Sequence, residues 1–323
     1  MKTITDLVSR YDMFPEGSRV LCAVSGGADS MCLLHWLHSS AEAMGISVAA
    51  AHFEHGIRGE ESLRDMRFVE EVCEEMGITL YTGHGSVPEY AAEKALCLEE
   101  AARELRYAFL EATAREHGFT RIATAHNADD NAETVLFNLA RGTGAAGLCG
   151  IPPVRGSIVR PLLETTRSEI ERYLEENGIS HIEDSSNGSQ QYSRNKIRLQ
   201  VMPVLREINP SVAKAILRTG DTLREDNRVL EELAEEFIAE HFNGESVRSK
   251  DLAALPDAVE ARVIRRLCPQ SISAVHTNDI MKLALGTELA YIDVPGARIR
   301  RQKGRIYFTD PPVPKNKKKK QSE

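Results

Sequence analysis

Residues 25–30 of this chain, Ser-Gly-Gly-Ala-Asp-Ser, place two adjacent glycines between hydroxyl side chains and one carboxylate. The continuous apolar run over 19–24 predicts a buried strand before them, and apolar residues at helical spacing predict a helix over 28–39. Glycines at such a strand-to-helix turn let backbone N–H groups converge, and the helix N-terminus adds positive potential. The segment therefore predicts a phosphate-binding loop.

The side chains of this loop suit different parts of that task. The hydroxyl groups can donate to phosphate oxygens, whereas Asp29 is expected to hold Mg²⁺ or to order the loop. The pattern is neither a Walker A motif nor a dinucleotide fingerprint. The alternative is a tight turn in which Asp29 caps the helix. The residues expected to bind the nucleotide are Ser25, Gly26, Gly27, Ala28, Asp29 and Ser30.

A second group of polar residues follows a strand expected over 121–125. Asp130 and Glu133 are three apart in a predicted helix over 130–141, so they share one helical face, and His126 lies just before this helix at the strand end. Acids are favoured in the first turn of any helix, which leaves a purely stabilising role open. A carboxylate pair at the edge of a sheet can also hold an ammonium group and accept its proton.

The elements that position these residues alternate between short β-rich runs and longer helical patterns. Further strands are expected at 46–52, 79–81 and 160–163, with helices near 62–76 and 98–117. This order predicts an α/β fold, a Rossmann-like doubly wound parallel sheet. A second, smaller, mostly helical domain is expected beyond it, with helices over 223–242 and 260–267 and strand character at 291–300 and 305–308. The predicted domains are 1–208, 209–310 and a basic, disordered tail over 311–323.

Composition limits the classes of protein that fit. The 323 residues are 42% hydrophobic and 27% charged, with a formal net charge of −8, which argues against indiscriminate nucleic-acid binding. Ten basic residues against one acid over 298–320 nevertheless fit a polyanionic partner near the C-terminus. No run of 18 apolar residues and no leader pattern occurs, so we expect no membrane partner and a cytoplasmic location. The six cysteines form no CxxC pair.

The loop resembles the PP-loop of the N-type ATP pyrophosphatases, which split ATP into AMP and pyrophosphate. Further segments narrow the resemblance to the tRNA(Ile)-lysidine synthase family over roughly residues 18–203, and more weakly to residue 308. The family usually has a second histidine where this chain has Asn127. The matching segments are AHFEHGIRGEES over 51–62, AARELRY over 101–107, TAHNADDNAET over 124–134, RGTG over 141–144, EDSSN over 183–187 and YSRNKIR over 192–198.

This resemblance implies an ATP-dependent ligase that joins lysine to C2 of the wobble cytidine, position 34, of tRNA(Ile) with a CAU anticodon. Cytidine O2 is adenylated with loss of pyrophosphate, and the lysine amine then displaces AMP. The partners are tRNA(Ile) and free lysine, with ATP and Mg²⁺ as cofactors. The amphipathic helix over 223–242 permits a homodimer.

The resemblance and the residue chemistry together assign expected roles to particular side chains. Catalytic roles are expected for Asp29, Arg103, Asp130, Glu133 and Arg194, and ATP contacts are expected for the loop, His52 and Arg58. Lysine contacts are expected for Asp130, Glu133 and His126. Contacts with tRNA are expected for Arg194, Asn195 and Arg198, which lie in or beside a polar loop over 183–195 that is expected to be mobile. Arg106 fits a phosphate contact or a surface ion pair equally well.

Two other functions stay open. A PP-loop tRNA thiolase would need catalytic or cluster-binding cysteines, for which Cys149 is the candidate, and the lack of any CxxC pair argues against it. A nucleotide-binding regulator without catalysis is the third reading. The intact Asp29, Asp130 and Glu133 argue against that one.

Overall fold

The computed structural model describes residues 2–56, 60–182, 193–286 and 290–310. The chain divides into two compact units, Met1–Asp221 and Thr222–Glu323. The change of sequence character predicts a boundary at 208/209, but helix α11, Val212–His241, starts just beyond that point and contains the observed boundary. Within the described ranges, no helix is both long and apolar enough to cross a membrane.

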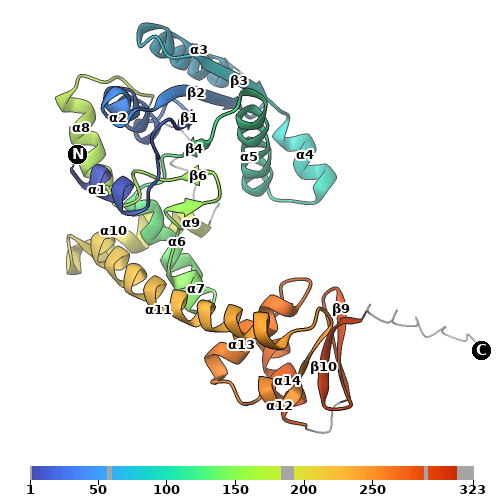
Figure 1. The fold of residues 1–323 in the computed structure, drawn as a ribbon. Coiled ribbons are helices and arrows are strands. Elements are labelled where there is room, and N and C mark those ends of the chain that lie inside the picture. The colour runs from blue at the N-terminus through green and yellow to red at the C-terminus, as the bar shows by residue number, and fades with distance from the viewer. Residues whose placement is uncertain (1, 57–59, 183–192, 287–289, 311–323) are drawn as a thin grey trace, which may run out of the picture. The chain divides into compact units, whose positions relative to one another are not determined.

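The first unit is built on a six-stranded sheet in the order β3-β2-β1-β4-β6-β5, in which only β5 runs antiparallel to its neighbour (Figure 1). This confirms the predicted doubly wound parallel sheet. The strands are β1 Arg19–Ala23, β2 Ser47–Glu54, β3 Leu80–His84, β4 Arg121–Ala123, β5 Val154–Arg155 and β6 Ile158–Val159.

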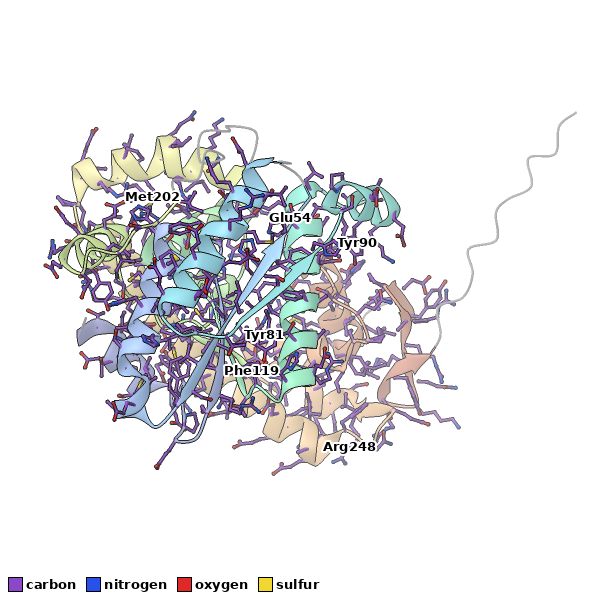
Figure 2. The ribbon with its side chains drawn as sticks, turned by 90° about the horizontal axis from the view of Figure 1, so that it is seen from above. Glu54, Tyr81, Tyr90, Phe119, Met202 and Arg248 are labelled. Carbon is purple, nitrogen blue, oxygen red and sulfur yellow. The ribbon has the colours of Figure 1, made fainter. Side chains whose placement is uncertain are left out.

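Both faces of this sheet are covered, which explains why β1 is continuously apolar. Val20 and Cys22 face one core, with side chains of α1, α2 and α8, whereas Leu21 faces a second core with Leu110 of α5. Near the far end of α5, Phe119 packs edge to face against Tyr81 of β3, with ring centroids 5.7 Å apart (Figure 2). The helices of this unit are α1 Lys2–Arg10, α2 Ala28–Met44, α3 Glu60–Glu75, α4 Val87–Lys94, α5 Leu98–His117, α6 Ala128–Ala140, α7 Ala145–Leu148, α8 Arg167–Glu176, α9 Ser193–Lys196 and α10 Met202–Ile208, with a π-helical turn at Ile197–Val201.

The expected strand at 160–163 is wrong, because these residues form turns that follow β6. Pro161 has no N–H group to donate to a neighbouring strand. Leu162 and Leu163 are apolar for another reason, since they are buried in the core that α1, α2 and α8 share with the sheet. The hydrophobic run was therefore a packing signal and not a strand signal.

The second unit joins helices to a separate antiparallel sheet in the order β7-β10-β9-β8. Ile299, Ile306 and Phe308 point inward onto α14, and alternate residues face outward. The strand expected over 291–300 is two strands, because Gly296 turns the chain at φ +77°. The elements are β7 Ser246–Arg248, α12 Ser249–Leu252, α13 Asp257–Leu267, α14 Ala274–Leu285, β8 Tyr291–Val294, β9 Ala297–Gln302 and β10 Arg305–Asp310.

Candidate active site

The glycine-rich loop joins the carboxyl end of β1 to the first turn of α2. Gly26 has φ +87°, and a Cβ there would lie 2.8 Å from Ile182 Cδ1. Only glycine meets both conditions without strain. The Ile182 N–H donates to the Gly26 carbonyl at 2.9 Å, which ties the loop to the segment after α8.

The two serines hold the loop in its curved form. Ser30 Oγ donates to the Gly27 carbonyl at 2.9 Å and accepts from the Ser25 N–H at 3.1 Å, and the two hydroxyls lie 3.2 Å apart. Helix α2 begins at this point with no side chain hydrogen-bonded as its N-cap in the described part of the chain. The N–H groups of its first turn can therefore bind an anion, and Asp29 does not act as the cap.

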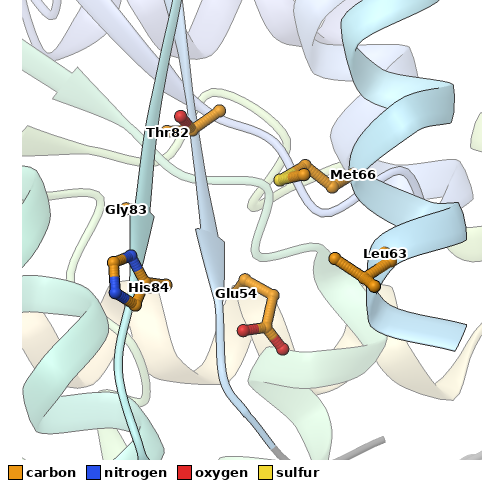
Figure 3. Close-up of a pocket in the computed structure, with 6 residues that line it drawn as sticks. All are labelled: Glu54, Leu63, Met66, Thr82, Gly83 and His84. Carbon is orange, nitrogen blue, oxygen red and sulfur yellow. The ribbon is translucent and has the colours of Figure 1, made fainter. Parts of the chain in front are cut away.

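The loop lines a cavity of about 1100 Å³ at the carboxyl edge of the sheet. Its walls come from the ends of β1, β2 and β4, from the first half of α5, from the first turns of α2, α6 and α8, from the segment after α8, and from Arg198 and Arg206. This is the edge at which a doubly wound sheet binds its ligand. A smaller cavity of about 270 Å³ lies between α3 and the strands β2 and β3 (Figure 3), and no predicted site residue lines it.

Asp29 points one carboxylate oxygen at an arginine and buries the other. Its Oδ2 accepts from Arg167 Nη1 at 3.0 Å, whereas Oδ1 is buried with no hydrogen-bond partner among the described residues. Burial raises the pKa of Asp29, and the Arg167 charge opposes that rise. A buried acceptor without a partner is costly, so Oδ1 fits a cation. Mg²⁺ is commonly held by one or two carboxylates together with substrate phosphates, and Asp29 fits that mode.

Asp130 has two roles in the structure. Its Oδ2 accepts from the Asn127 N–H at 3.1 Å while Asn127 Oδ1 accepts from the Asp130 N–H at 2.9 Å, which forms a capping box at the start of α6. Asn127, at the position where the resembled family usually has histidine, is therefore a helix cap. The second oxygen, Asp130 Oδ1, accepts from Arg198 Nη2 at 2.9 Å. Burial raises the pKa of Asp130 to about 6, against the lowering effect of Arg198.

Glu133 binds the same arginine with both oxygens. Arg198 Nε lies 2.6 Å from Oε1 and Nη2 lies 3.1 Å from Oε2, the paired geometry that makes such contacts strong. The Glu133 side chain is only 2% exposed. Asp130 and Glu133 thus share one face of α6, as their spacing predicts, and together hold a guanidinium group.

Among the described residues, the acidic wall of the cavity contains more carboxylates than arginines. Each of the three arginines is paired with at least one of the four carboxylates, and Glu171 adds a further, more exposed acid beside Arg167. The excess negative charge favours an additional cation in this part of the cavity. The carboxylates are Asp29, Asp129, Asp130 and Glu133, and the arginines are Arg167, Arg198 and Arg206.

The two predicted histidines differ in position. His126 lines the cavity, and its Nδ1 lies 3.1 Å from Thr124 Oγ1. His52 is 5% exposed, does not line the cavity, and donates from Nδ1 to the Val24 carbonyl at 2.9 Å. The ring thus holds the residue before the loop, and the expected contact of His52 with ATP stays a prediction.

The other predicted residues divide by location. Arg103 and Arg106 of α5 line the cavity. Asn195 lies in α9 outside the cavity lining, and of Arg194, in the same helix, only the backbone is described. Arg58 and most of the polar loop over 183–195 lie outside the described residues.

Sequence reasoning missed several residues of this cavity. Arg167 and Arg206 bind the acids Asp29 and Asp129 across long sequence separations, and Phe53 and His55 follow the predicted second strand. Phe53 lies near the carboxyl end of β2 and His55 directly follows that strand, where the fold places the crevice, so that position was a usable signal. No local pattern marks Arg167 or Arg206.

A parallel sheet with a Ser-Gly-Gly-x-Asp-Ser loop between β1 and α2 defines a PP-loop nucleotide-binding protein. The family model described as "PP-loop domain" matches residues 2–205, and the chain belongs to this family.

Curated relatives named tRNA(Ile)-lysidine synthase confirm the narrower resemblance. The protein from Bacteroides thetaiotaomicron is 41% identical over 84% of this chain and 63% of its own length, and that from Bacillus subtilis is 36% identical over 88% and 63%. The chain thus spans about three fifths of the length of these relatives. A solved U34-tRNA thiolase from Methanococcus maripaludis superposes with a TM-score of 0.59 at 19% identity, covering 69% of this chain and 79% of that one, which supports the fold alone.

Proposed function

We propose that this protein is a tRNA(Ile)-lysidine synthase, which uses ATP to join lysine to C2 of cytidine 34. The observation that carries the proposal is one cavity that combines a phosphate-binding loop with a carboxylate pair holding a cation. Curated relatives named tRNA(Ile)-lysidine synthase match more than four fifths of this chain, which supports the same reaction.

The chemistry requires both parts of the cavity. Cytidine O2 is a poor leaving group, so it first attacks the α-phosphate of ATP and releases pyrophosphate. The lysine ε-amine then forms a bond to C2, and the bond from C2 to the adenylated oxygen breaks to release AMP. Loop N–H groups and hydroxyls stabilise the phosphate charge in the first step. Mg²⁺, where Asp29 binds it, supplies further positive charge at the phosphates.

The second step needs an unprotonated amine. Free lysine carries an ammonium group at neutral pH, because its pKa is about 10.4. The Asp130–Glu133 pair, which already binds a guanidinium, is suited to bind that ammonium. We assign the proton transfer to Asp130, because burial raises its pKa to about 6, which makes it a better proton acceptor than an ordinary carboxylate.

The remaining assignments follow the same proposal. Residues 209–310 bind tRNA, supported by the outward arginines of β9 and β10, where Arg300 stacks on Tyr307 at 4.4 Å. Arg198 moves from the acid pair toward the RNA when lysine binds. A cytoplasmic location agrees with a substrate set of tRNA, lysine and ATP.

The decisive experiment is mass spectrometry of a tRNA(Ile) transcript after incubation with the protein, ATP and lysine. We expect the transcript to gain one lysine less one water, with one AMP released for each lysine incorporated. The control omits lysine and should give no mass gain. Full turnover with glutamine in place of lysine and with no tRNA present would overturn the proposal.

A further inference from the structure

A group of arginines, two of which line the cavity, has no carboxylate to balance its charge among the described residues. Four arginines from α5, β5 and the turn after β6 surround the single side chain of Tyr107. The Cζ atoms of three of them lie between 5.2 and 5.7 Å from the Tyr107 ring centroid. They are Arg103, Arg106, Arg155 and Arg160, and we call them the Tyr107 arginine cluster.

The cluster differs from the acidic wall in its partners. Arg167, Arg198 and Arg206 are each paired with a carboxylate. In the part of the chain that the structure describes, no member of the Tyr107 arginine cluster has a carboxylate partner: their contacts are with the ring and with backbone.

Burial makes this imbalance costly. Arg160 is 1% exposed, its Nη1 donates to the Pro152 carbonyl at 2.6 Å, and its Nε has no hydrogen-bond partner in the described residues. Desolvation lowers the pKa of Arg160 and of Arg106; the Tyr107 side chain beside them opposes that shift, and neighbouring arginines add to it. Buried like charges of this kind are stabilised by an anion.

The position of the cluster indicates which anion. Arg103 and Arg106 line the cavity, whereas Arg155 is exposed and lies outside the lining, so the cluster runs from the cavity to the surface. The phosphate loop at β1 already has its own donors for ATP. A polymer whose base enters the cavity and whose backbone stays outside would place a phosphodiester at this rim.

We propose that Arg103, Arg106 and Arg155, supported by the buried charge of Arg160, bind a backbone phosphate of the substrate RNA next to the nucleotide whose base enters the cavity. The inference rests on the proposed function for the identity of that RNA. Arginine is suited to this contact because its planar fork of donors matches phosphate oxygens.

The test measures binding of a tRNA(Ile) transcript at several salt concentrations, for the wild type and for Arg155→Gln. Losing one phosphate contact should reduce the slope of log Kd against log salt by about 0.7–0.9, a roughly threefold difference between 50 and 200 mM. Arg155→Lys keeps the charge and should keep the slope. Arg115→Gln, an exposed arginine farther along α5, is the matched control and should leave it unchanged.

A second arm locates the phosphate. A transcript with one neutral methylphosphonate linkage beside cytidine 34 should bind the wild type more weakly than the unmodified transcript binds it. Arg155→Gln should bind the two transcripts equally well. Unchanged RNA binding by Arg155→Gln, or a loss of ATP affinity in its place, would overturn the inference. Because binding is read without turnover, failure of lysidine formation by the wild type would count against the proposed function alone.

Discussion

Glu133→Gln tests the carboxylate pair most directly. Glu133 is nearly fully buried and gives both oxygens to a cation, so the substitution removes one negative charge without changing side-chain size. A hydrogen bond to a charged group contributes about 1.5–3 kcal/mol. If the lysine ammonium uses this pair, its KM should rise about 10- to 150-fold.

The folding cost should be small enough to leave this effect visible. Arg198 is 39% exposed and keeps Asp130 as a partner, so solvent screens much of the lost attraction. A loss of about 1 kcal/mol would lower the Tm by roughly 2–4 °C for a domain of this size. Thermal unfolding of both proteins checks that estimate.

The assay separates the two chemical steps. Pyrophosphate release with ATP and tRNA(Ile) but no lysine follows adenylation, and AMP release at varied lysine follows the second step. We expect adenylation within about twofold of wild type. Glu164→Gln is the control, because Glu164 pairs with Arg10 at 2.7 Å outside the cavity. A lysine KM within threefold of wild type would refute the role given to Glu133.

Three further predictions concern protonation, sulfur and the loop. Binding of the ammonium needs ionised Asp130, whose pKa is about 6. Between pH 5 and 8, kcat/KM for lysine should therefore be level above pH 7 and fall about tenfold per pH unit below pH 6. A kcat/KM that decreases as the pH rises through this range would contradict the role of Asp130. Cys149→Ser should retain full AMP release, because Cys149 donates to a backbone carbonyl and lies outside the cavity lining; abolished turnover would revive the thiolase reading. Gly26→Ala should lower ATP affinity in calorimetry and lower the free energy of unfolding by about 1–2 kcal/mol, because the new Cβ meets Ile182 at a positive φ. Gly142 also has a positive φ but lies in open space, so Gly142→Ala is the control and should leave ATP affinity unchanged.

Local features of the fold and the site were predictable from sequence. The loop follows from glycine and hydroxyl chemistry between a strand and a helix, and the shared face of Asp130 and Glu133 follows from helical spacing. The predicted helix over 98–117 coincides with α5, because its apolar face is periodic and Gly118 ends it in the left-handed region.

What could not be predicted depends on contacts distant in sequence. The Arg167–Asp29 pair joins residues 138 positions apart, and nothing near either one indicates the other. Arg198 was expected at the RNA, and its place on the acid pair is a tertiary contact across 65 residues to Glu133. The strand predicted over 160–163 was wrong because a short apolar run is found both in buried strands and in turns that pack into a core.

The capping box at α6 limits how the amine site can respond to its substrate. A carboxylate that also ends a helix cannot follow a ligand, because moving Asp130 would release the Asn127 N–H that it binds. Under the proposed function, the fixed acids therefore hold the terminal amine at one position relative to the carbon that it attacks, and the backbone of α6 sets that position.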